Sequence, residues 1–330
     1  MDSKNTEYIL KLPEVQQEKI RRILDLKEKY NVLLLAHTYQ REPIQLIADV
    51  LGDSLKLARA AQKEREADYI LFCGVRFMAE TASIINQNKK IVFPEPQSTC
   101  SMASYANADI LRVYKRSNPG IPIMVYINSN AETKTMADVI CTSSNSVHIA
   151  KKIQEEFNSR RIAFSPDKNL GRYIASETGI DVDIVPEEGN CYVHNDYTID
   201  DVKKASEKWP DGKLLVHPES PLEVLNEADF VGSTSQIIRW AEENLDVEPL
   251  IIGTEIGVTE YLRREYPLRE IVPLSEKAVC KAMKQITLDS IIEALIEIDS
   301  QKYAVKVDED TAKRSKDAIN KMMELSKSIK

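Results

Sequence analysis

Short apolar runs alternate with amphipathic stretches along most of the chain, and this alternation predicts strands separated by helices. In the first third we expect helices at 13–30, 43–50, 55–65 and 77–87, and strands at 32–36, 69–73 and 90–93. Strands that alternate with helices form parallel sheets whose two faces are covered by the helices. The pattern therefore predicts an α/β fold.

The same pattern recurs with a period of roughly 90 residues. Similar segments begin at Ala48, Ala137 and Ala228, at steps of 89 and 91 residues. Three other segments share a β-branched run, a proline and a final cysteine, and they end at Cys100, Cys191 and Cys280. We therefore predict three pseudo-repeated αβα units with short parallel sheets.

The predicted units span residues 1–99, 100–190 and 191–280. After Cys280 the alternation stops, and the apolar spacing predicts two helices, at 287–297 and 310–326. No fourth unit begins. The simplest arrangement is a helical tail, 281–330, that packs back on the first unit.

Composition and charge narrow the range of partners. The chain has 330 residues and a formal charge of −8, with basic residues interspersed among acidic ones, which argues against a nucleic-acid partner. No apolar run reaches the roughly 18 residues of a membrane span, and the first residues lack the order of a signal peptide. We expect a cytoplasmic protein that binds neither nucleic acid nor membrane.

The five cysteines do not suggest a disulfide framework, because their number is odd and the chain is long. Cys100, Cys191 and Cys280 are almost equally spaced, and three converging thiolates would leave a metal or an iron–sulfur cluster with one open position. The alternative is three unrelated buried thiols. Cys73 and Cys141 end apolar strands and are expected in the core.

Polar residues follow the predicted strand ends, where parallel sheets bind their ligands. Ser54, Ser143 and Thr234 stand where helices are expected to begin and are suitable N-cap residues. Helix N-termini attract carboxylates and phosphates, so these three positions are candidate anion contacts. The alternative is that they only cap their helices.

Three of the four histidines, His37, His194 and His217, lie beside recurring segments, whereas His148 lies within a predicted helix and is expected to be structural. Tyr39 follows His37, and Glu219 follows His217. Either pair could supply general acid and base groups. Alternatively, the carboxylate only orients its histidine. No dinucleotide-binding or P-loop motif is present.

A series of motifs extends over nearly the whole chain, from His37-Thr-Tyr39 through Gly52-Asp-Ser54 and His217-Pro-Glu219 to the segment that begins at Cys280. In this order the motifs resemble those of the quinolinate synthase family. The resemblance implies a triangle of three αβα units around a central 4Fe-4S cluster. It also implies that Cys100, Cys191 and Cys280 bind the cluster and leave one iron open.

The resemblance further implies an activity. The family condenses iminoaspartate with dihydroxyacetone phosphate to quinolinate, with release of phosphate and water, in NAD biosynthesis. The open iron would act as a Lewis acid on the substrate. L-aspartate oxidase or aspartate dehydrogenase would be a transient functional partner, because either enzyme supplies iminoaspartate.

Site residues follow from the same resemblance. The implied acid–base groups are His37, Tyr39 and Glu219. The implied substrate contacts are His37, Ser54, Tyr126, Asn128, Ser143, His194, His217, Glu219, Ser233 and Thr234.

Arg76, Asn195 and Ser220 depart from the family pattern, and none of them is a predicted cluster ligand. Two other functions are kept as alternatives. One is another three-cysteine 4Fe-4S enzyme of similar build, such as the diphthamide-forming enzymes. The other is a non-catalytic iron–sulfur sensor.

Overall fold

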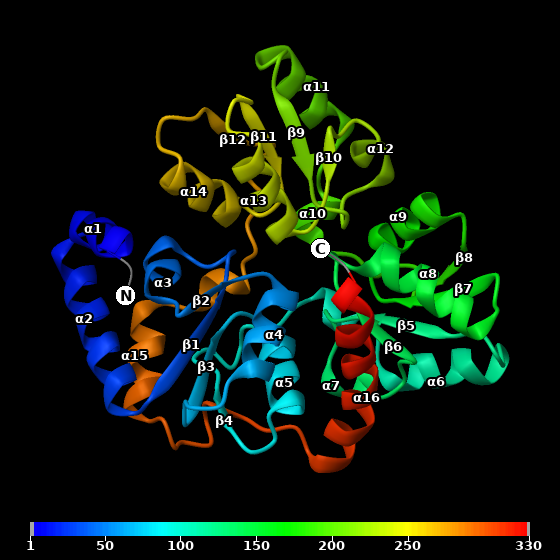
Figure 1. Ribbon diagram of the computed structural model, residues 1–330, viewed down its shortest axis with the longest axis horizontal. Helices are drawn as coiled ribbons and strands as arrows, with labels where there is room; N and C mark the ends of the chain where they lie inside the picture. The colour runs from blue at the N-terminus through cyan, green and yellow to red at the C-terminus, as the bar shows by residue number, and fades with distance from the viewer. Residues whose placement is uncertain (1–2, 329–330) are drawn as a thin grey trace. The chain divides into compact units, whose positions relative to one another are not determined.

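Helices and strands alternate through three separate sheets in the computed structural model, which describes residues 3–328 (Figure 1). Twelve of the thirteen strands in this described part pair in parallel, and β13 pairs antiparallel with β4. The predicted α/β class is confirmed. The chain divides into two compact units, formed by the described residues of Met1–Cys100 with Cys280–Ala312 and of Ser101–Val279 with Lys313–Lys330.

The first unit contains a five-stranded sheet of order β13-β4-β3-β1-β2. Its strands are β1 (Val32–His37), β2 (Val50–Gly52), β3 (Tyr69–Cys73), β4 (Lys90–Val92) and β13 (Ala304–Val305). Its helices are α1 (Ser3–Lys11), α2 (Glu14–Lys29), α3 (Glu42–Ile47), α4 (Ser54–Lys63), α5 (Arg76–Ile85), η2 (Met283–Gln285) and α15 (Leu288–Ile296).

The second unit contains two four-stranded sheets, of order β6-β5-β7-β8 and β10-β9-β11-β12. Their strands are β5 (Ile123–Tyr126), β6 (Val139–Cys141), β7 (Arg161–Ser165), β8 (Asp181–Ile184), β9 (Lys213–Val216), β10 (Phe230–Val231), β11 (Leu250–Gly253) and β12 (Ile271–Pro273). The helices are η1 (Met102–Ser104), α6 (Ala108–Ser117), α7 (Ala131–Lys134), α8 (Ser146–Phe157), α9 (Lys168–Thr178), α10 (Tyr192–Asn195), α11 (Ile199–Lys208), α12 (Leu222–Leu225), α13 (Thr234–Glu243), α14 (Ile256–Glu265) and η3 (Ser326–Ser328).

An aspartate attaches the second strand of each sheet to the first. Asp138 donates its N–H to the carbonyl of Ile123 at 2.9 Å and accepts the N–H of Ile123 on Oδ2 at 2.8 Å. Asp49 makes the same pair of bonds with Leu34, and Asp229 makes them with Leu214. The recurring Ala-Asp segments of the sequence are therefore sites where a side chain extends the hydrogen bonding between two parallel strands.

The amphipathic spacing in α2 has the expected result, since Ile20, Ile23 and Lys27 form its buried face. The helix α15 packs against α2, and Lys19 pairs with Asp289 at 2.7 Å (Figure 1). The first part of the chain after Cys280 therefore lies on the first unit.

The prediction of a purely helical tail is wrong, because Ala304–Val305 forms β13 and adds an edge strand to the first sheet. The sequence analysis also missed β2 and α1, which are too short to show a clear period. The last helix, α16 (Glu309–Leu325), ends in the second unit. There Ser315 donates to the carbonyl of Ala131 at 3.1 Å, and Lys321 pairs with Glu156 at 2.7 Å.

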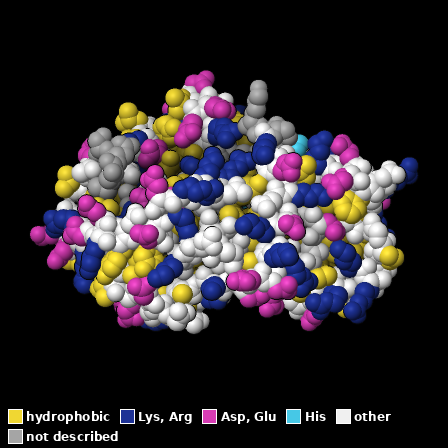
Figure 2. Space-filling view, turned by 60° about the horizontal axis from the view of Figure 1, so that its bottom comes forward, with side chains coloured by type: hydrophobic (Ala, Val, Ile, Leu, Met, Phe, Trp, Pro, Cys, Tyr) yellow, Lys and Arg dark blue, Asp and Glu magenta, His cyan; other side chains and the backbone are white. Residues whose placement is uncertain are grey.

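Charges of both signs are interspersed over the face shown in Figure 2, as they are in the sequence. Among residues 3–328, no helix is long and apolar enough to cross a membrane.

We predict that Asp138→Ala lowers the free energy of unfolding by about 1–3 kcal/mol, because the N–H of Ile123 loses its acceptor. Asp109→Ala is the control. Its carboxylate is 81% exposed and pairs only within α6, with Arg112, so its loss should cost less than about 1 kcal/mol. Urea unfolding of both variants measures the difference. Equal losses would contradict the structural role of Asp138.

Candidate functional site

A buried carboxylate, Glu219, lies at the centre of a hydrogen-bonded cluster in the second unit. It accepts the hydroxyl of Tyr126 on Oε1 at 2.6 Å, and its Oε2 lies 2.7 Å from Nδ1 of His194. Nε2 of His194 is 2.9 Å from the hydroxyl of Thr254. Tyr126 ends β5, Glu219 follows β9, and Thr254 follows β11. The cluster therefore joins the carboxyl ends of both sheets of this unit, where ligands of parallel sheets bind.

His217 completes the cluster. Its ring stacks on that of His194 with 4.4 Å between centroids, and its Nδ1 lies 3.8 Å from Oε2 of Glu219. All three side chains are buried. The carboxylate is thus surrounded by a phenol and two imidazoles rather than by water.

These neighbours set the charge state of the cluster. Burial acts to raise the pKa of Glu219, but the charge of His217 and the hydrogen bonds from His194 and Tyr126 outweigh it and lower the pKa to about 2. Burial, followed by the charge of Glu219, raises the pKa of Tyr126 well above its usual value. At neutral pH the cluster therefore contains an ionised carboxylate that accepts a hydrogen bond from a neutral phenol.

Cys191 lies beside this cluster. One ligand atom each from Cys191, His194 and Glu219 falls within 4.8 Å of the others, so these residues can hold a metal ion. A thiolate, an imidazole and a carboxylate are the donors that zinc and iron prefer. Sequence reasoning grouped Cys191 with two other cysteines, and the structure adds His194 and Glu219 to its surroundings.

The three predicted cluster cysteines occupy equivalent places in the chain. Cys100, Cys191 and Cys280 are half-buried thiols, each on the loop after the last parallel strand of a sheet. Cys73 and Cys141 are fully buried, as predicted, and burial raises the pKa of both thiols. Half-buried thiols on loops that follow strand ends have the donor chemistry of iron–sulfur ligands.

His37 and Tyr39 lie together in the first unit, at the end of β1. The Tyr39 N–H donates to Nδ1 of His37 at 3.1 Å, and the two rings meet edge to face at 4.4 Å. The same turn occurs at His217, whose Nδ1 accepts the N–H of Glu219 at 3.4 Å. Because Nδ1 of His37 is an acceptor, a neutral His37 ring carries its proton on Nε2.

The expected N-caps are wrong by one or two residues. The caps are Asp53, Asn145 and Ser233, because these residues have the non-helical backbone that an N-cap needs. Ser54 and Thr234 are instead the first residues of α4 and α13. Ser143 precedes the cap of α8, and its hydroxyl hydrogen-bonds to Tyr126. Ser143 therefore belongs to the same cluster as Glu219.

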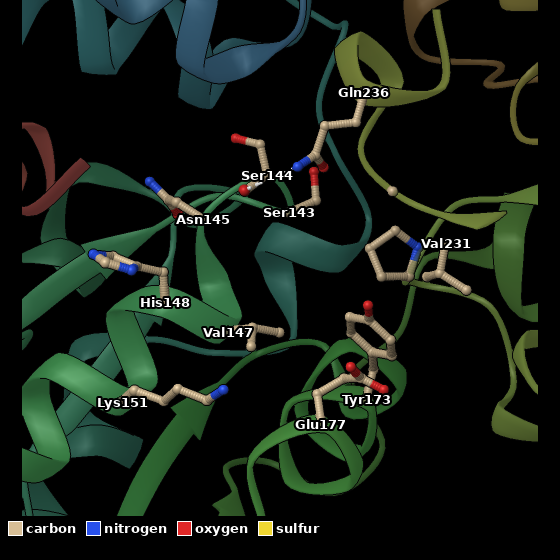
Figure 3. Close-up of a pocket in the computed structure, with 12 residues that line it drawn as sticks. Ser143, Ser144, Asn145, Val147, His148, Lys151, Tyr173, Glu177, Val231 and Gln236 are labelled. Atoms are coloured by element: carbon tan, nitrogen blue, oxygen red, sulfur yellow. Dashed lines mark hydrogen bonds between the residues drawn. The ribbon is translucent and has the colours of Figure 1, made fainter. Parts of the chain in front are cut away.

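A cavity of about 380 Å³ lies beside the Ser143 loop (Figure 3). Its polar lining comes from the loop, from α8 and α9, and from α13. The lining residues are Ser143, Ser144, Asn145, Val147, His148, Lys151, Tyr173, Glu177, Pro218, Val231, Gly232 and Gln236. His148 has a structural contact, as expected, with its Nε2 at 3.2 Å from the carbonyl of Leu325.

Sequence reasoning assigned no role to several residues that the structure places around Glu219. Thr254 holds His194, and its carbonyl accepts the hydroxyl of Tyr197 at 2.7 Å. Asn169 donates to the carbonyl of Glu219 at 2.9 Å. Asn128 has a buried amide oxygen that lacks a hydrogen-bond partner among the described residues. Nothing in the linear sequence shows which distant residue Thr254 or Asn169 contacts.

Comparison with known proteins identifies the family of the chain. A family profile described as quinolinate synthetase A protein matches residues 21–324. The quinolinate synthase of Methanocaldococcus jannaschii is 41% identical over 93% of this chain and 98% of its own length. That of Thermotoga petrophila is 44% identical over 92% of this chain and 98% of its own. That of Pyrococcus horikoshii is 42% identical over 93% and 99%.

The matched residues include the whole Glu219 cluster and the three cysteines predicted as cluster ligands, and they span both compact units. The chain therefore belongs to the quinolinate synthetase A protein family.

Proposed function

We propose that this protein is a quinolinate synthase that condenses iminoaspartate with dihydroxyacetone phosphate, releasing phosphate and water, in NAD biosynthesis. The observation that carries the proposal is the buried hydrogen-bonded cluster of Glu219, Tyr126 and His194 at the carboxyl ends of two sheets. The relatives are named quinolinate synthases, which supports quinolinate as the product. Condensation and dehydration both require groups that hold and move protons, and this cluster supplies them.

Acid and base roles follow from the contacts. A pKa of about 2 makes Glu219 alone a weak base, so we assign it the hydrogen-bonded link between the Tyr126 hydroxyl and Nδ1 of His194, along which a proton can move. His194 is held at both ring nitrogens, by Glu219 and by Thr254, so its ring orientation is set before a ligand binds. In the first unit, His37 and Tyr39 are the proposed second acid–base pair.

The two substrates carry carboxylates and a phosphate, which need hydrogen-bond donors. We assign these contacts to the starts of α4, α8 and α13, where backbone N–H groups and hydroxyls come together. The hydroxyls belong to Ser54, Ser143, Ser233 and Thr234. The unpartnered oxygen of Asn128 is available to a protonated group of the ligand. His37, Tyr126, His194, His217 and Glu219 complete the proposed substrate contacts.

Cys100, Cys191 and Cys280 are proposed to hold one 4Fe-4S cluster. Three half-buried thiols on equivalent loops support this assignment. When bound, a cluster with three cysteine ligands supplies a Lewis-acidic iron at its fourth corner. In the chain itself, His194 and Glu219 lie beside Cys191 and would face such a group.

The remaining expectations are proposals of the same kind. We propose three αβα units, 1–99, 100–190 and 191–280, in a triangle around the cluster, with residues 281–312 packed on the first unit. The protein would be cytoplasmic. L-aspartate oxidase or aspartate dehydrogenase would supply its iminoaspartate.

The activity is tested with anaerobically purified protein, dihydroxyacetone phosphate and a source of iminoaspartate. Quinolinate and phosphate should appear in equal amounts. If neither product forms while the cluster is intact, the protein is not a quinolinate synthase.

Cluster assignment leads to a prediction about metal content. Wild-type protein prepared without oxygen should contain about four irons and four sulfides per chain. Cys100→Ser, Cys191→Ser and Cys280→Ser should each lose this content, because each removes a thiolate ligand. Cys73→Ser and Cys141→Ser are controls and should keep it. Full iron content in any of the first three variants would remove that cysteine from the ligand set.

Acid–base assignment predicts that Glu219→Gln lowers turnover by about 10²–10⁴-fold while iron content stays normal. Glutamine can still accept from Tyr126, but it carries no charge and cannot take a proton. Tyr39→Phe should have a similar effect. Glu188→Gln, at an exposed glutamate, is the matched control and should turn over normally. Near-normal rates in Glu219→Gln would exclude proton transfer by this residue.

Anion contacts can be separated from capping. Neither Ser143 nor Thr234 is an N-cap, so replacing either one removes no capping bond. Ser143→Ala and Thr234→Ala should each weaken phosphate binding about tenfold, the effect of one lost hydrogen bond to a charged group. Thr198→Ala removes the N-cap of α11 and is the control. It should lose about 1 kcal/mol of stability with unchanged phosphate affinity. Calorimetric titration and thermal unfolding measure the two quantities, and unchanged affinity in the first two variants would contradict their role.

A further inference from the structure

The loop that carries Cys191 lies on the turn that begins α9. Lys168 donates its N–H to the carbonyl of Gly189 at 2.7 Å. Cys191, two residues after Gly189, donates its N–H to Oδ2 of Asp167 at 3.0 Å. Two hydrogen bonds therefore join residues 189–191 to residues 167–168, within the second unit.

Gly189 allows this close approach. A Cβ atom at this position would lie 1.9 Å from the carbonyl oxygen of Pro166 and 2.9 Å from its carbonyl carbon. Both distances are far shorter than van der Waals contact, and both atoms belong to the backbone. Any side chain at position 189 would therefore push the loop away from the turn.

Asp167 does more than cap its helix. Its Oδ1 accepts the N–H of Leu170 at 2.7 Å, which is the N-cap bond of α9. Capping needs one oxygen, and asparagine caps as well as aspartate. The second oxygen is occupied by Cys191, and the whole side chain is buried.

The same turn also reaches the catalytic carboxylate. Asn169 donates its Nδ2 to the carbonyl of Glu219 at 2.9 Å and to Oδ1 of Asn195 at 3.1 Å. Residues 167–169 therefore contact the Cys191 loop on one side and the Glu219 loop on the other.

We propose that residues 167–169, which we name the α9 turn, are a positioning element that holds the Cys191 thiol at a set place beside Glu219. Asp167 is its positioning residue for Cys191, and Asn169 is its positioning residue for Glu219. Its use in catalysis rests on the proposed function. The placement of the thiol does not, because both hydrogen bonds form within the protein chain alone.

The test compares alkylation of individual cysteines by iodoacetamide in the full chain prepared without iron, with peptides resolved by mass spectrometry. Asp167→Asn keeps the cap of α9 but presents an amide NH₂ to the N–H of Cys191. Gly189→Ala displaces the same loop without a change of charge. In both variants Cys191 should react about tenfold faster, as expected when a buried hydrogen bond is lost, while Cys100 and Cys280 should be unchanged.

The matched control is Asp53→Asn, since Asp53 caps α4 by accepting the N–H of Lys56, as Asp167 caps α9. Its Cys191 should react at the wild-type rate. After anaerobic reconstitution with ferrous iron and sulfide, the first two variants should retain less iron than Asp53→Asn.

Three results would overturn the proposal. The first is a Cys191 rate within about twofold of wild type in both variants, below the tenfold expected for one such hydrogen bond. The second is faster alkylation only in Asp167→Asn, which would indicate an effect of the side chain other than on the position of the loop. The third is an equal rise at all three cysteines. Absence of iron from the wild-type protein would contradict the proposed function instead. The alkylation rates would still decide whether the α9 turn positions Cys191.

Discussion

The site depends on the hydrogen bonds and charges that keep one buried carboxylate, Glu219, ionised. Removing a charge from water costs several kcal/mol unless hydrogen bonds and opposite charges compensate for it. Glu219 receives this compensation from Tyr126, His194 and His217, and its low pKa shows that the compensation exceeds the cost. The positions of those three side chains are in turn restricted, since each must keep its polar atoms near one carboxylate.

This requirement explains the outer contacts of the cluster. His194 satisfies its second ring nitrogen with Thr254, and Ser143 bonds to Tyr126. Asn169 holds the backbone of Glu219. Buried polar groups with partners on several elements order those elements relative to one another. Within the second unit, the cluster therefore links β5, α9, α10 and the ends of β9 and β11.

Parallel sheets make such a cluster possible, because they bring all their strand ends to one edge. The edge strands of these sheets form few backbone hydrogen bonds, because β2, β6 and β10 contain only two or three residues. Asp49, Asp138 and Asp229 strengthen them with a side-chain bond to the neighbouring strand. The loop after each of these strands leads to Ser54, Ser143 or Thr234, so the aspartates also determine where the proposed anion contacts begin.

The sequence by itself determined the α/β class and the recurring segments, because hydrophobic period and spacing are local properties. Candidate site residues such as Tyr126, Asn128 and Ser233 came from the resemblance of its motifs to a family. The N-caps were misplaced because a cap depends on where the backbone leaves the helix, and composition shows this only to within a residue or two. Only the tertiary structure decided which groups meet. Tyr126 and Glu219 are 93 residues apart, and Asp167 and Cys191 are 24 apart. The charge of Glu219 depends on its contacts in the folded chain. Burial and neighbouring groups set its pKa, and neither is a property of the residue alone.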